Sequence, residues 1–69
     1  MSVYKVIELI GTSDKSWEDA AATAVKKASE TLRNLRVAEV VKQDLDIADN
    51  GVVTYRTKLN VSFKFEGGE

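Results

Sequence analysis

The sequence predicts an α+β fold whose elements follow the order β-α-β-β. Residues 3–10 are mostly β-branched or aromatic, residues 17–33 repeat alanine at three- and four-residue spacing, and residues 52–65 alternate apolar with polar side chains. Strands and amphipathic helices produce these periods of two and about 3.6 residues, respectively. Because no linker or internal repeat divides the 69 residues, we expect a single domain spanning 1–69.

The first strand is expected at residues 3–10, where the apolar run is too short for a typical helix. Ser16 is the predicted N-cap of the helix, because its hydroxyl can accept a hydrogen bond from an unpaired backbone N–H in the first turn. The helix is predicted to continue to residue 33 and to end at Asn34, which tolerates the left-handed conformation. Trp17 is predicted to pack the first turn against the sheet or against a neighbouring subunit.

The second half of the chain is predicted to be a β-hairpin. Residues 36–47 are mostly strand formers, and Asp49-Asn50-Gly51 then supplies a turn, because Asn-Gly accepts the positive φ angles of tight hairpins. The final strand is expected at 52–65, and residues 66–69 are predicted to be a flexible C-terminal tail. Its apolar face would carry Val53, Tyr55, Leu59, Val61, Phe63 and Phe65, interrupted only by Thr57.

A single copy leaves too much of this sheet uncovered. The helix would be about 25 Å long, whereas the last strand would extend for about 45 Å. The inward stripe of the helix is mostly alanine, which buries little area per residue. We therefore expect copies to pack together over the surplus apolar face, especially near Phe63 and Phe65. The alternative is a monomeric two-layer domain whose surplus apolar residues are partly exposed.

Composition excludes several classes of function. Ten Lys and Arg balance eleven Asp and Glu without a basic cluster, which argues against nucleic acid as a partner. No apolar stretch is long enough to span a membrane and no secretion signal is present, so we expect a cytoplasmic protein. Cysteine and histidine are absent, so any metal would be a hard, oxygen-binding cation. Without histidine or cysteine, the sequence shows no catalytic nucleophile with an adjacent general base, and we expect no enzyme activity.

The order of elements and several motifs resemble the dodecin family over nearly the whole chain. The resemblance implies a three-stranded antiparallel sheet wrapped around one helix, assembled into a hollow homododecamer. In flavin-binding dodecins, pairs of flavins are held between subunits. The segments that carry the resemblance are VYKVIELIGTS at 3–13, TLRNL at 31–35, VAEV at 37–40 and VSF at 61–63.

The flavin site of that family is only partly matched. Val37 stands where flavin dodecins have a tryptophan that stacks on the flavin ring, and an aliphatic side chain cannot replace that stacking. Arg56 stands where they have a glutamine, and arginine donates hydrogen bonds but cannot accept them. Weak or no flavin binding is therefore expected. The alternative is a storage dodecin for FMN or riboflavin, with an adapted pocket around Val37, Gln43, Asp46 and Arg56.

Arg36 followed by Val37 is similar to a subset of dodecins described as calcium-binding. Asp44 and Asp46 share one face of the predicted second strand, about 7 Å apart, and Glu39 precedes them. Their oxygens suit calcium, particularly where copies of the chain come together. These three acids are also expected to pair with Arg36, Arg56 or Lys58. Two further alternatives remain open: a solvated edge that blocks strand pairing, and an assembly without a dedicated ligand.

Overall fold

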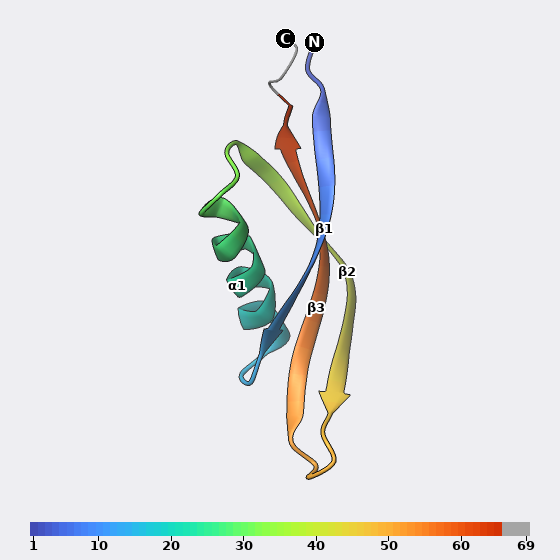
Figure 1. The fold of residues 1–69 in the computed structure, drawn as a ribbon. Helices are drawn as coiled ribbons and strands as arrows, with labels where there is room; N and C mark the ends of the chain where they lie inside the picture. The colour runs from blue at the N-terminus through green and yellow to red at the C-terminus, as the bar shows by residue number, and fades with distance from the viewer. Residues whose placement is uncertain (66–69) are drawn as a thin grey trace.

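The computed structural model describes residues 1–65 and confirms the predicted β-α-β-β order (Figure 1). The predicted tail at 66–69 lies outside the described residues. The first strand is three residues longer than predicted at its C-terminal end, because it continues through Gly11 to Ser13. The elements are β1 at Tyr4–Ser13, α1 at Trp17–Ser29, β2 at Leu35–Ile47 and β3 at Val53–Lys64.

The three strands form an antiparallel sheet in the order β1-β3-β2. β3 lies in the centre and pairs with β1 on one side, where Tyr4 is opposite Lys64, and with β2 on the other, where Ile47 is opposite Val53. The sheet is strongly twisted and α1 packs against one of its faces, while the β2–β3 hairpin continues well past the end of the helix (Figure 1). The long axis of the molecule is 51 Å, whereas a 13-residue helix is about 20 Å long.

The core is small and lies between α1 and the centre of the sheet. Its buried side chains are Thr57, Leu59 and Val61 on β3, with Ala20, Ala24 and Ala28 on the helix. From Thr57 to Val61 every second residue of β3 is buried, which confirms the predicted alternation and the interruption at Thr57. The alanine stripe lets the helix approach the sheet closely, but it contributes little apolar area.

Both ends of the helix can be traced to specific residues. The Ser16 hydroxyl accepts a hydrogen bond from the backbone N–H of Asp19, as predicted for an N-cap. The predicted C-terminus at residue 33 is wrong, because the helix ends at Ser29. Asn34 does adopt the left-handed conformation, with φ of 61°, but it lies directly before β2 rather than at the helix end. Its carbonyl oxygen accepts a hydrogen bond from the N–H of Lys64, so Asn34 connects the start of β2 to the end of β3.

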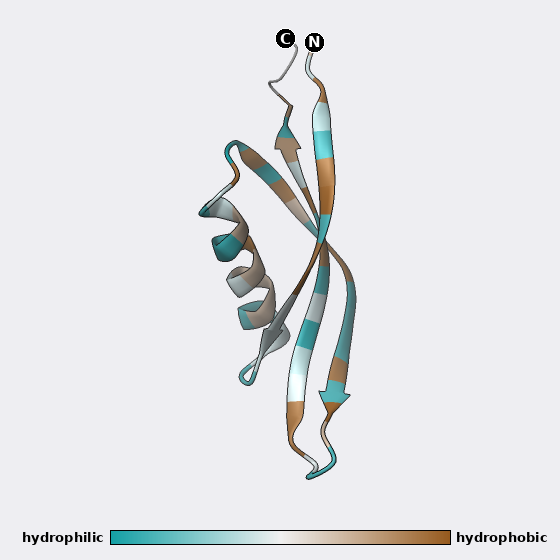
Figure 2. Cartoon of the chain, viewed as in Figure 1, coloured by the Kyte–Doolittle hydropathy of each residue, from teal (hydrophilic) through white to brown (hydrophobic). Residues whose placement is uncertain are grey.

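Much apolar surface remains exposed at both ends of the subunit. Figure 2 shows apolar segments on the part of β1 near the chain termini and at the hairpin end of β2 and β3, both beyond the helix. Val6 is 58% exposed and Ile47 is 69% exposed. The prediction that the helix covers only part of the sheet is therefore confirmed. Among residues 1–65 there is no helix with the length and apolarity needed to cross a membrane.

Candidate functional site

The predicted ligand residues lie mostly on the face of the sheet that points away from α1, which we call the outer face. On this face Asp44 of β2 lies opposite Arg56 of β3, and Asp46 lies opposite Thr54. Side chains alternate between faces along each strand, and the buried residues of β3 all belong to the other face. The outer face is therefore the polar side of the hairpin.

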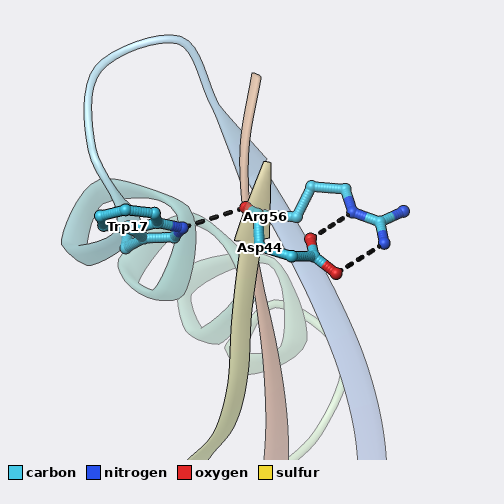
Figure 3. Close-up of polar contacts among 3 residues, drawn as sticks. All are labelled: Trp17, Asp44 and Arg56. Atoms are coloured by element: carbon cyan, nitrogen blue, oxygen red, sulfur yellow. Dashed lines mark hydrogen bonds and ion pairs between the residues drawn. The ribbon is translucent and has the colours of Figure 1, made fainter. Parts of the chain in front are cut away.

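Asp44 and Arg56 form a bidentate ion pair across the hairpin (Figure 3). Arg56 Nε donates to Asp44 Oδ1 at 2.7 Å, and Nη2 donates to Oδ2 at 2.9 Å. The hydrogen bonds from Arg56 hold the pKa of the Asp44 carboxyl below its ordinary value of 3.8, and the charge of Lys42 acts in the same direction. Both carboxylate oxygens are thus engaged, although the side chains remain partly accessible to solvent.

Trp17 joins the start of α1 to the same position of β2. Its indole Nε1 donates to the backbone oxygen of Asp44 at 3.0 Å (Figure 3). The indole ring also packs edge to face on the ring of Tyr55, with centroids 5.1 Å apart. The backbone carbonyl oxygen of Trp17 accepts a hydrogen bond from Thr57 Oγ1. The prediction that Trp17 packs the first turn of the helix against the sheet is confirmed. Asp44 is therefore held through its backbone on one face and through its side chain on the other.

The three acids predicted to bind a metal are not gathered into one site by a single chain. Asp44 and Asp46 share the outer face as predicted, whereas Glu39 lies farther along β2, opposite Asn60. Within residues 1–65 no three acidic side chains come together as a metal site. Because Asp44 is already paired with Arg56, a bound cation would need further oxygens from solvent or from another copy of the chain.

The residues predicted for an adapted flavin pocket also do not meet within one subunit. Val37, opposite Ser62, and Asp46, opposite Thr54, are separated by eight residues of β3, or about 27 Å. Arg56 lies between them on the outer face. Gln43 pairs with Thr57 and so points to the helix side of the sheet. Val37 is 61% exposed, which leaves it accessible to a ligand or to another subunit.

The predicted ion pairs are found in part, and the contribution of β1 was not foreseen. Arg56 pairs with Asp44 as expected, whereas Lys58 Nζ lies 3.4 Å from Glu8 on β1 rather than near an acid of the hairpin. Arg36 donates to its own neighbour's carbonyl oxygen, that of Leu35. No sequence signal points to β1 here, because the position of β3 between the other two strands cannot be read from local patterns.

Comparison with known proteins agrees with this architecture. The family model described as Dodecin matches residues 3–66. The chain is 56% identical to calcium dodecin of Mycobacterium tuberculosis over 64 residues, which cover 93% of this chain and 90% of that protein. It is 41% identical to dodecin of Thermus thermophilus, over 93% of each chain.

The fold comparison gives the same answer. The crystal structure of the calcium-chelating calcium dodecin of Mycobacterium tuberculosis superposes with a TM-score of 0.88 at 51% identity, covering 99% of this chain and 97% of that one. Dodecin from Streptomyces coelicolor also gives 0.88 at 34% identity, over 97% and 96% of the two chains. The family model spans almost all described residues and both relatives share the complete β-α-β-β unit. This chain belongs to the dodecin family.

Proposed function

We propose that this chain is the subunit of a homododecameric shell that binds and sequesters a divalent cation, calcium, and that it is not an enzyme. The observation that carries the proposal is the 56% identity, over nearly the whole chain, to a relative named calcium dodecin. Val37 and Arg56 support it further. The aliphatic Val37 cannot stack on a flavin ring, and Arg56, which already donates two hydrogen bonds to Asp44, cannot accept one from the ring edge.

The exposed apolar surface supports the assembly. Val6 and Ile10 on β1, and Ile47 at the hairpin end of β2, are each more than half exposed. Exposed large apolar residues at both ends of one subunit are surface that other copies of the chain can cover. Light scattering coupled to size-exclusion chromatography should give a particle of about 91 kDa, twelve times the 7.6 kDa chain. A stable particle of 7.6 kDa would contradict the proposed shell.

We assign the cation to oxygens of Asp44, Asp46 and Glu39, completed by oxygens from other copies. Carboxylates are the ligands that calcium prefers, and about six to eight oxygens are needed. Asp46 has no ion-pair partner among residues 1–65, and its carboxylate is on the same face as Asp44. Asp44 would have to exchange part of its pairing with Arg56 for the metal.

Isothermal titration with calcium chloride tests this assignment. We expect saturable heat with the assembled protein and roughly tenfold weaker binding, or more, for Asp46→Asn, because one anionic ligand is lost. Asp14→Asn is the matched control, since Asp14 is an exposed acid before the helix and away from the outer face. Absence of calcium heat from the assembled wild-type protein, or an equal loss in both variants, would contradict the assignment.

The second candidate function is the storage of riboflavin or FMN. The relationship to dodecin of Thermus thermophilus and the accessibility of Val37 favour it. Because Val37 and Asp46 are far apart in one subunit, the pocket would have to combine them from different copies. Quenching of flavin fluorescence distinguishes the two functions. Saturable quenching at micromolar protein would establish flavin binding, whereas no quenching would leave cation binding as the remaining candidate.

A further inference from the structure

Two lysines face each other across the hairpin on the outer face. Lys42 of β2 is the register partner of Lys58 of β3. Directly opposed side chains in an antiparallel pair lie about 5 Å apart at Cβ, and like charges in this arrangement destabilise the sheet. Arg56 is the next residue of β3 on the same face, so three cationic side chains lie in sequence along the strand pair.

These cations line a small recess. Its volume is about 130 Å³, and it is lined by Ile10, Lys42, Asp44, Arg56 and Lys58. A recess of this volume holds several water molecules, and it is therefore large enough for a tetrahedral oxyanion.

The free polar groups that line the recess are all hydrogen-bond donors. Both oxygens of Asp44, which is the only acid of the lining, are already engaged by Arg56. Lys58 is balanced by Glu8 at 3.4 Å, and Lys42 has no ion-pair partner within the described chain. The remaining groups are the ammonium groups and the unused N–H bonds of Arg56, all of which donate. A ligand that fits must supply acceptors and negative charge.

We infer that this recess binds a small oxyanion of the phosphate class, either free or as the phosphate group of a larger ligand. Lys42 supplies the unpaired charge, and Lys58 and Arg56 supply further donors. Charge-assisted hydrogen bonds from such cations to phosphate oxygens are short and strong. The recess shares Asp44 with the proposed calcium ligands, but its ligand differs in chemistry, because calcium requires oxygen acceptors and the free groups of the recess are donors.

Isothermal titration of inorganic phosphate into the assembled protein, in a buffer of constant chloride and without added calcium, tests the inference. We expect saturable binding that becomes about tenfold weaker in Lys42→Gln and is retained in Lys42→Arg. Lys26→Gln is the matched control, because Lys26 is an exposed lysine of α1 and lies outside the recess. Circular dichroism of each variant verifies that the fold is kept.

Each outcome bears on the site or on the source of its anion. Equal losses in Lys42→Gln and Lys26→Gln would show a diffuse charge effect and overturn the site, as would the absence of phosphate heat from the wild-type protein. A parallel titration with phenyl phosphate identifies the source of the anion: tighter binding than inorganic phosphate indicates the phosphate group of a larger ligand, and equal or weaker binding indicates the free anion. Calcium titration of the same samples shows whether the proposed cation function stands independently.

Discussion

Replacement of Gly11 by alanine should separate the helix from the sheet. A Cβ atom at Gly11 would overlap the carbonyl oxygen of Ala20 and would lie 2.9 Å from its carbonyl carbon and 3.0 Å from the Cβ of Ala24. Two of these atoms are helix backbone, and Ala20 is completely buried, so no rotation of a side chain can relieve the overlap. The helix would have to move away from β1 as a unit.

The expected loss can be set against the stability available. Overpacking a close contact costs about 1–3 kcal/mol, and more where backbone has to move. A domain of this length has about 3–10 kcal/mol in total, at about 0.05–0.15 kcal/mol per residue. We expect Gly11→Ala to lose about 3 kcal/mol or more in urea unfolding followed by Trp17 fluorescence, at one fixed protein concentration because assembly contributes to stability.

Gly51→Ala is the matched comparison for this experiment. Gly51 has a φ of 86°, and no atom lies within 4 Å of the place that an added Cβ would occupy, so its substitution tests conformation without steric overlap. A left-handed backbone costs a non-glycine residue about 1–2 kcal/mol. If Gly11→Ala loses no more than Gly51→Ala, then the contact with Ala20 does not position the helix, and the reasoning is refuted.

The core and the neighbourhood of Asp44 carry three further predictions. Leu59→Ala should cost about 2–5 kcal/mol in urea unfolding, because it empties the centre of the core. Trp17→Phe should lower the unfolding free energy by about 1 kcal/mol in the same assay followed by circular dichroism, because the hydrogen bond to the Asp44 backbone is lost. The folded pKa of Asp44 is lowered, so its stabilisation is complete above pH 3.8 and is lost as the pH falls toward the folded pKa. The melting temperature of Asp44→Asn should therefore lack the decrease at low pH that comes from protonation of Asp44, whereas Asp46→Asn should keep that decrease.

The fold was largely predictable because its signals are local. The alternation along β3, the capping hydroxyl of Ser16 and the Asn-Gly turn each act within a few residues. The first two are found as expected, and the turn is found with a positive φ at Gly51 but not at Asn50. The helix end was not predictable in the same way. Residues beyond Ser29 would continue the helical pattern, but the chain has to leave the helix to bring Asn34 to Lys64 at the end of the central strand β3. The position of this tertiary contact cannot be read from the local helical pattern.

The candidate site was less predictable because it depends on strand register. Irregular pairing between Leu35 and Val37, and again between Val40 and Lys42, shifts β2 against β3. A bulge changes which face the following residues occupy. Consequently Glu39 and Asp44 lie on the same outer face, although they are an odd number of residues apart. A strict alternation would place them on opposite faces, and no pattern in the sequence marks the two shifts.

Assembly would change the energetics of the outer face, because apolar and charged residues lie there side by side. Ile10 and Val37 are both more than half exposed on the same face as Asp44, Arg56 and Lys42. Covering this surface lowers the effective dielectric constant, and a fall from about 80 to about 20 strengthens charge interactions about fourfold. The paired Asp44 and Arg56 would then hold each other more firmly. An unpaired Lys42 would become costly, because a buried charge requires a partner. If the proposed shell covers this surface, Lys42 would therefore need a negatively charged partner, either a bound anion or a carboxylate of a neighbouring copy.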